Sequence, residues 1–217
     1  MSETFTHGHS FTNAPKSDQN KKVPAVSAVE FNKLRQNAVY MVLDAREADE
    51  FARSFIPGSL NIAASGSYAL LYGLADFSQK LLLLCQPGRE KETINRLAIV
   101  GYQNVVASLE GGIKTWGEAG LPLTSVPVIS LKEVKDLLRD KIPVHIIELG
   151  NGEKKGTVLP AAISISLEAI ESGLLRIDRS MTYFVVGETM NEAVFMVSVA
   201  RTRGFSNLIP VNSGTRA

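Results

Sequence analysis

The chain contains a single cysteine, Cys85, and its setting indicates nucleophilic chemistry. Cys85 follows the apolar run Leu81–Leu84, typical of a buried strand, and precedes a Pro-Gly loop that leads into a helix. Such a loop aims several backbone N–H groups at one point, and the helix dipole also favours an anion there. We therefore expect a thiol pKa below about 8.5, with Arg89 adding positive charge and Gly88 permitting the tight turn. The alternative is that Cys85 is a small buried apolar residue that ends a Leu-rich strand.

The residues around Cys85 alternate between short apolar strands and amphipathic helices. One helix is expected from the Ser27–Glu30 capping signature to about Gln36, and another after the Pro-Gly turn, ending at Gly101. Strands separated by helices at this spacing predict an α/β fold with a mostly parallel sheet, in which ligands bind beyond the carboxyl ends of the strands. The predicted strands are Val39–Leu43, Leu60–Ile62, Leu81–Leu84 and Val105–Leu109.

Three separated segments recur at one offset, 103 residues further along the chain. They are Ile56–Ile62 with Leu159–Ile165, Gly101–Val105 with Gly204–Leu208, and Gly111 with Gly214. A single offset that serves three segments predicts a tandem duplication, jointed at the proline-containing connector Leu121–Val128. Both halves are therefore expected to share one α/β fold, each with a mostly parallel central sheet flanked by helices.

Length and composition limit the remaining possibilities. The 217 residues suit two domains of about 100 residues. Lys plus Arg number 23 and Asp plus Glu 22, a balance that gives no electrostatic footprint for nucleic acid or an anionic membrane. A single cysteine excludes an internal disulfide and a Cys-rich zinc site, and it fits a reducing compartment.

The N-terminal residues 1–22 are polar and are expected to form a disordered tail without a signal peptide. The tail contains His7 and His9, but the Asp and third His of a metal-binding His-x-His motif are missing, so no metal site is expected. The apolar runs are too short to span a bilayer. We expect a cytoplasmic protein with no membrane or nucleic-acid partner.

Residues 23–124 resemble the rhodanese (sulfurtransferase) family, which predicts tandem rhodanese-like domains. The matching motifs, in the family's order, are Asp44-Ala45-Arg46, Glu50-Phe51, Ile56–Ile62, Cys85–Arg89, Gly101-Tyr102, Leu109–Gly112, Trp116 and Gly120–Pro122. The resemblance implies a catalytic Cys85 that carries a persulfide, bound in the loop of Gln86, Pro87, Gly88, Arg89 and Glu90 by the backbone N–H groups that this loop offers. It also implies that Asp44 and Arg46 shape the rim of the site, although an exposed ion pair worth under about 1 kcal/mol is the alternative for them.

Two departures from the family pattern stand near the motifs. Glu90 stands where a basic or hydroxyl residue is common, and its carboxylate would repel a bound anion unless it points outward. Ser54-Phe55 replaces the common Gly-His. With the Gly66–Tyr68 stretch, this variant resembles the rhodanese portion of proteins fused to a metallo-β-lactamase-fold persulfide dioxygenase.

Residues 125–217 resemble the family more faintly and are expected to form a noncatalytic, truncated rhodanese-like domain. Glu148 corresponds to Asp44, and Gly187–Asn191 replaces the cysteine loop without supplying a thiol. We expect this half to dock against residues 23–124, because it lacks a closing segment over part of its apolar face. His145, in an apolar run, is expected to be a core histidine.

The leading hypothesis is an enzyme that moves sulfane sulfur from a donor such as thiosulfate to a thiol or cyanide acceptor, through a persulfide on Cys85. No cofactor and no metal are required. A sulfur-relay protein is a further candidate partner. One alternative is a low-turnover persulfide carrier or regulatory module that serves a partner protein. The other is a phosphatase with a Cys-x5-Arg loop, which would require Arg where this chain has Lys91.

Overall fold

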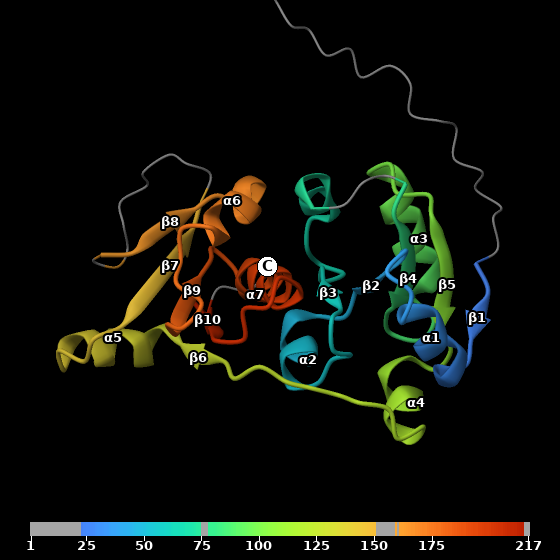
Figure 1. The fold of residues 1–217 in the computed structure, drawn as a ribbon, viewed down its shortest axis with the longest axis horizontal. Helices are drawn as coiled ribbons and strands as arrows, with labels where there is room; N and C mark the ends of the chain where they lie inside the picture. Colours follow the sequence, from blue (N-terminus) through green and yellow to red (C-terminus); the bar gives the residue numbers. More distant parts are fainter. Residues whose placement is uncertain (1–22, 75–77, 151–158, 160, 215–217) are drawn as a thin grey trace, which may run out of the picture.

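The computed structural model describes residues 23–74, 78–150, 159 and 161–214. They form two α/β halves, joined by a connector that runs along one side of the molecule (Figure 1). The tail predicted at residues 1–22 lies outside the described residues. The domain boundaries at 23–124 and 125–217 stay predictions.

The first half is built on a five-stranded sheet with the order β1-β5-β4-β2-β3, and all its pairings are parallel. Crossover connections carry the chain between these strands, as parallel pairing requires. In chain order, its elements are β1 Ala25–Val26, α1 Ala28–Arg35, β2 Tyr40–Asp44, α2 Ala48–Arg53, β3 Leu60–Asn61, the 3-10 helix η1 Tyr68–Gly73, β4 Lys80–Leu84, α3 Glu90–Ile99, β5 Val105–Leu109 and α4 Gly112–Glu118.

The second half repeats this arrangement, with the order β6-β10-β9-β7-β8 and parallel pairing throughout the described strands. Numbered within each half, the two orders are identical, so the predicted shared fold is confirmed. Its elements are β6 Ile129–Ser130, α5 Leu131–Arg139, β7 His145–Leu149, β8 Ile163–Ile165, the 3-10 helix η2 Leu167–Ala169, α6 Ile170–Leu174, β9 Tyr183–Val186, α7 Met190–Thr202 and β10 Leu208–Asn212.

Local signals in the sequence account for several element ends. The Ser27 side chain accepts a hydrogen bond from the Glu30 N–H at 3.3 Å, so the predicted start of α1 is confirmed. The turn before β3 uses Gly58 at φ +83°, and Ala161, 103 positions later, adopts φ +60°. The two halves therefore share a left-handed turn residue at this position, although only the first has the glycine that favours it.

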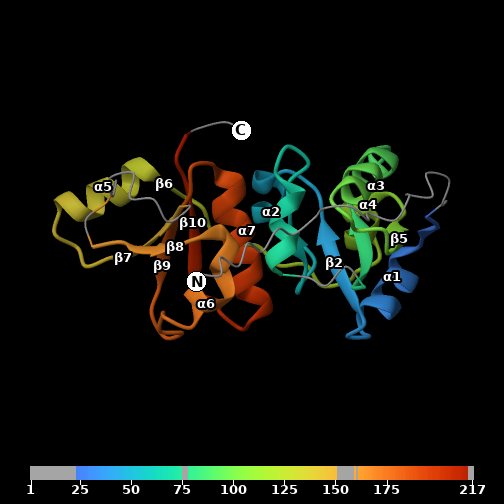
Figure 2. The same cartoon turned by 90° about the horizontal axis from the view of Figure 1, so that it is seen from above.

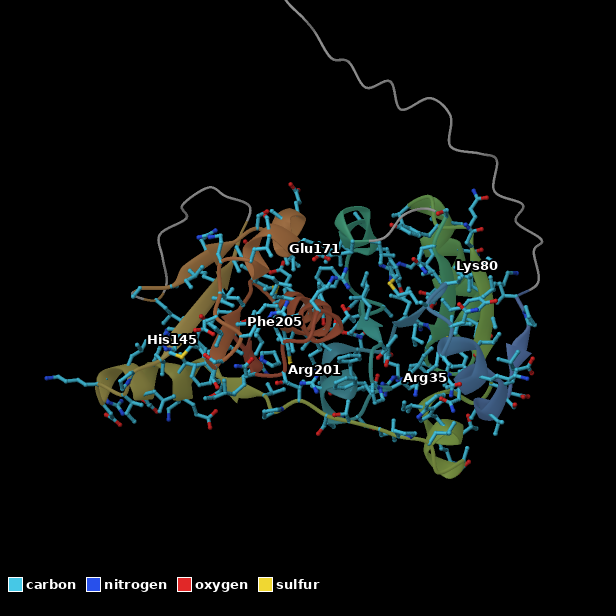
Figure 3. The ribbon with its side chains drawn as sticks, in the orientation of Figure 1. Arg35, Lys80, His145, Glu171, Arg201 and Phe205 are labelled. Carbon is cyan, nitrogen blue, oxygen red and sulfur yellow. The ribbon has the colours of Figure 1, made fainter. Side chains whose placement is uncertain are left out.

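Helix α7 lies between the two sheets in both views (Figures 1 and 2). Every residue from Ala193 to Ala200 is buried. The helix packs on β9 and β10 of its own half and on α2 and β3 of the first half. The Arg201 guanidinium adds a cation–π contact, 5.4 Å from the centre of the Phe55 ring (Figure 3). The second half therefore docks against the first, as expected.

At this interface, the Ser198 hydroxyl supplies a hydrogen-bond acceptor to a backbone N–H at the edge of the first sheet. Strand β3 lies at the edge of the first sheet, and the Asn61 N–H donates to Ser198 Oγ of α7 at 3.0 Å. Ser198 Oγ in turn donates to Phe195 O at 2.7 Å, inside the helix. An open strand edge is thereby closed by a helix from the other half.

The connector is fixed to the first half rather than suspended between the two. Phe55 and Thr124 exchange two backbone hydrogen bonds, and the Val126 N–H donates to Ala52 O at 2.9 Å. None of the described helices has both the length and the apolar character needed to cross a membrane.

We predict that Ser198→Ala destabilises the protein by about 1–3 kcal/mol, because it leaves the buried Asn61 N–H without its acceptor. Urea unfolding of the full chain measures the change. Thr202→Ala is the matched control, since the Thr202 hydroxyl donates only within α7, to Val199 O. Equal unfolding midpoints for the two variants would contradict a role for Ser198 between the halves.

Candidate active site

Cys85 directly follows β4, at the carboxyl edge of the first sheet, and only 5% of it is exposed. The loop after it turns tightly: Gly88 has φ +88°, and the Arg89 N–H donates to Gln86 O at 3.0 Å. Arg89 is the N-cap of α3 and makes no side-chain capping bond. The N–H groups of the first turn of α3 therefore have no partner within the helix, and they are available to an anion.

Two neighbouring elements support this loop. Gly112, at the start of α4 with φ +67°, lies so close that a Cβ there would come within 3.2 Å of Cys85 O and 3.4 Å of Pro87 Cδ. The Leu109–Gly112 motif therefore includes a glycine that the packing requires. From the other side, Gln86 Nε2 donates to both carboxylate oxygens of Glu50, at 2.6 and 2.8 Å.

The structure corrects the expected pKa of the thiol. Burial raises the pKa of Cys85 to about 12, and the Glu90 and Asp44 carboxylates also act to raise it, while a hydrogen bond with the Thr93 side chain lowers it. Glu90, although the first residue of α3, is near enough to oppose a thiolate. The Arg89 side chain is more than half exposed and pairs with Glu92 at 2.9 Å, so it does not supply the expected positive charge at the thiol.

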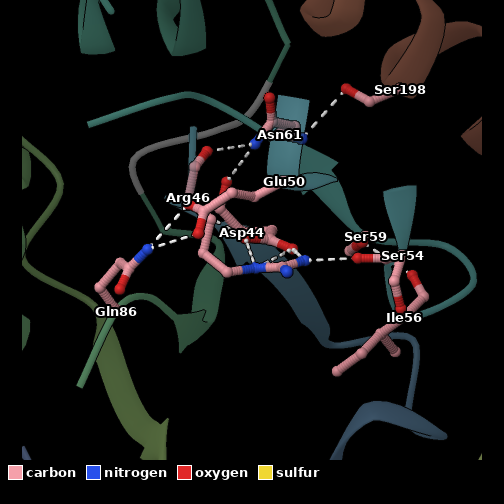
Figure 4. A network of polar contacts seen from close by, with 9 residues as sticks. All are labelled: Asp44, Arg46, Glu50, Ser54, Ile56, Ser59, Asn61, Gln86 and Ser198. Carbon is pink, nitrogen blue, oxygen red and sulfur yellow. Dashed lines mark hydrogen bonds and ion pairs between the residues drawn. The ribbon is translucent and has the colours of Figure 1, made fainter. Parts of the chain in front are cut away.

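Asp44 and Arg46 form a buried ion pair, so the exposed-pair alternative for them is wrong. Asp44 is fully buried and Arg46 is 5% exposed, with Arg46 Nη2 2.5 Å from Asp44 Oδ2 (Figure 4). Burial raises the pKa of Asp44, and the hydrogen bonds and charge of Arg46 oppose that rise. Arg46 Nη2 also donates to Ser54 O, and Asn61 Nδ2 donates to the backbone oxygens of Asp44 and Arg46. The pair fixes the backbone beside the site; its proposed place at the rim stays a prediction.

Two further residues at the site were missed by the sequence analysis. Thr93 is buried one turn into α3, interacts with the thiol, and donates from Oγ1 to Arg89 O at 2.9 Å. Helical periodicity from Glu90 could have placed it on the face toward Cys85. Tyr68, at the start of η1, is buried and interacts electrostatically with Cys85. The sequence analysis used the Gly66–Tyr68 stretch only for its resemblance to fusion proteins, and it gave Tyr68 no role at the thiol.

In the second half, the position matching the cysteine loop leads into α7 and holds no thiol, since Cys85 is the sole cysteine of the sequence. His145 is exposed at the start of β7, so the prediction of a core histidine is wrong (Figure 3). Its ring instead lies 5.5 Å from the Tyr183 ring. Within the described residues, no three His, Cys, Asp or Glu side chains gather into a metal site. His7 and His9 lie outside these residues.

The fold and the site together define a class: α/β proteins with a cysteine between a parallel strand and an open helix N-terminus. The model of the Rhodanese-like domain matches residues 27–119. The thiosulfate sulfurtransferase GlpE of Actinobacillus succinogenes is 35% identical over 89 residues, which are 41% of this chain and 77% of that protein. The chain therefore belongs to the rhodanese family.

Solved structures with a similar fold include two sulfurtransferases. The thiosulfate sulfurtransferase of Pseudomonas aeruginosa has a TM-score of 0.42 and 19% identity, and the match covers 87% of this chain and 43% of that one. This chain thus spans less than half of that protein. SseA of Escherichia coli, a 3-mercaptopyruvate sulfotransferase, has a TM-score of 0.40 and 13% identity. That match covers 90% of this chain and 100% of SseA. The resemblance to metallo-β-lactamase fusions stays a prediction.

We predict that Asp44→Asn destabilises the protein by about 3–5 kcal/mol, because the buried Arg46 guanidinium loses its counter-charge. Asp49→Asn is the matched control: its pair with Arg53 is exposed and is worth under about 1 kcal/mol. Denaturant unfolding of both variants gives the two values. Equal losses of stability for the two variants would show that the buried pair is not a structural requirement.

We also predict that Glu90→Gln lowers the pKa of Cys85, because it removes a carboxylate that opposes the thiolate. The pH profile of alkylation should then move to lower pH. At a pH below both midpoints, a variant whose pKa is one unit lower has about ten times the thiolate fraction of wild type, and it is alkylated about ten times faster. Glu118→Gln, on α4 and paired with Lys114, is the control and should leave the profile unchanged. Coincident profiles for wild type and Glu90→Gln would place the Glu90 carboxylate away from the thiol.

Proposed function

We propose that this protein is a sulfurtransferase that carries sulfane sulfur on Cys85. The Cys85 thiolate attacks the outer sulfur of a donor such as thiosulfate, a Cys–S–S⁻ persulfide forms, and sulfite leaves with the electrons of the broken S–S bond. A thiolate or cyanide acceptor then attacks the outer sulfur and takes it, and the Cys85 thiolate is restored. The observation that carries the proposal is the position of Cys85, between β4 and the uncapped start of α3.

The surroundings suit an anionic intermediate better than they suit a free thiolate. The free thiol is buried beside Glu90 and Asp44, which oppose its ionisation. In a persulfide the charge lies one atom further out, about 2 Å from Sγ. Backbone N–H groups of the loop and of the first turn of α3 can then stabilise that charge, as donors stabilise an oxyanion in acyl transfer.

The raised pKa of Cys85 also favours the second candidate, a persulfide carrier with low turnover. A thiol with a pKa of about 12 is almost fully protonated near pH 7, so attack on a small free donor is slow. A partner protein that docks at the site and supplies both the sulfur and a base would overcome that limit. Two measurements distinguish the enzyme from the carrier: the fraction of Cys85 loaded with sulfur in a single turnover, and the steady-state rate of transfer. A carrier loads fully but has a low steady-state rate.

Small-molecule sulfur donors and thiol acceptors are the proposed partners, together with a sulfur-relay protein in the carrier case. A reducing compartment such as the cytoplasm suits a reaction that requires its one cysteine to stay unoxidised.

We predict that Cys85→Ser abolishes both sulfur loading and the formation of thiocyanate from thiosulfate and cyanide. Intact mass after incubation with thiosulfate should show one added sulfur atom on wild type and none on the variant. Because Cys85 is the only thiol of the chain, no second site can hide the effect. Activity of the variant within tenfold of wild type would refute the proposed function.

A further inference from the structure

The Tyr68 hydroxyl is a buried polar group with no hydrogen-bond partner in the described part of the chain. Only 3% of Tyr68 is exposed. Buried hydroxyls are normally hydrogen-bonded, and one without a partner calls for an explanation in function or in an absent ligand. Burial raises the pKa of Tyr68, so the hydroxyl keeps its proton at neutral pH and remains a donor.

Several contacts hold the Tyr68 ring in place. The Arg96 guanidinium of α3 lies 4.7 Å from the ring centre, and Arg96 Nη2 donates to Gly66 O at 2.9 Å. On the other side, η1 packs against η2 of the second half. Asn191 Nδ2 of α7 also donates to Ser65 Oγ, three residues before Tyr68. Both halves of the molecule therefore hold η1 and the Tyr68 ring in place.

Tyr68 shares its surroundings with the thiol. The charge of an ionised Cys85 raises the pKa of Tyr68, and the Thr93 side chain, which lies near the Tyr68 hydroxyl without reaching hydrogen-bond geometry, lowers it. The same Thr93 side chain interacts with Cys85. The three groups thus form one cluster, which buries a thiol and two hydroxyls. The Tyr68 hydroxyl nevertheless makes no hydrogen bond to Cys85 Sγ, so it is unpaired while the cysteine carries no sulfur.

We propose that the Tyr68 hydroxyl donates a hydrogen bond to the outer sulfur of a persulfide on Cys85. The added sulfur lies about 2 Å beyond Sγ and carries the negative charge, so it offers the acceptor that the bare thiol does not. Tyr68 is then a binding residue for the transferred sulfur, and it selects the loaded form of the site over the empty one. This inference rests on the proposed sulfur transfer.

The experiment compares Tyr68→Phe with Tyr102→Phe, its matched control. Tyr102 is also a buried tyrosine, but its hydroxyl donates to Leu71 O at 2.9 Å. In the unloaded protein, Tyr68→Phe should leave the melting temperature unchanged or raised, because it removes an unpaired polar group. Tyr102→Phe should lower the melting temperature, because it leaves Leu71 O without that donor.

Each protein is then loaded with inorganic polysulfide, and intact mass follows the persulfide with time. Wild type and Tyr102→Phe should keep the added sulfur for similar times and melt at a higher temperature when loaded. Tyr68→Phe should lose the sulfur about tenfold faster and show no rise in melting temperature on loading, as expected for a lost hydrogen bond to a charged acceptor.

The outcomes separate this inference from the proposed function. If wild type takes up sulfur and Tyr68→Phe retains it as long as wild type, the role of Tyr68 is refuted while sulfur transfer stands. If wild type takes up no sulfur from either polysulfide or thiosulfate, both proposals fail together.

Discussion

The buried ion pair of Asp44 and Arg46 is the interaction on which the arrangement of the site depends. It joins the end of β2 to the end of α2, because Arg46 also donates to Ser54 O. The Asn61 side-chain amide of β3 donates to the backbone oxygens of Asp44 and Arg46, and the Asn61 backbone N–H donates to Ser198 of the second half. Two charges removed from water persist only with such complete pairing. One chain of polar contacts therefore extends from the cysteine edge of the first sheet to the interface with α7 (Figure 4).

Much of the architecture could be predicted from the sequence, because it follows from local patterns. The strands predicted from apolar runs begin and end within about one residue of β2 and β4, and the Ser27 cap predicted the start of α1. The repeat offset predicted two halves with one fold, since equivalent turns recur at Gly58 and Ala161. These features depend on residues close together in the chain, whose types and spacing limit the backbone.

The electrostatics of the site could not be predicted in the same way. The loop pattern predicted a lowered pKa for Cys85, but the depth of burial and the approach of Asp44, from a neighbouring strand, reverse the sign. These are tertiary quantities. The prediction of a core histidine at position 145 was wrong for a related reason. An apolar run predicts a strand, but it does not show which of its residues lies at the exposed end. Tyr68 lies on a 3-10 helix whose sequence carries no catalytic motif, and only the tertiary fold brings it near enough to Cys85 for an electrostatic interaction.

The two halves differ in how the helix at the matching position begins. The N-terminus of α7 is closed by its own side chains: Thr189 accepts from the Glu192 N–H, and the Glu192 carboxylate accepts from the Glu188 N–H. At the matching position α3 begins at Arg89 without a side-chain cap. The Thr189 cap gives one N–H of the first turn of α7 an acceptor, so an anion there gains less than at α3, where no side chain takes that place. The second half has no cysteine before α7, and the start of α7 carries a side-chain cap. Helix α7 instead packs between the halves, against β9 and β10 on one side and against α2 and β3 on the other.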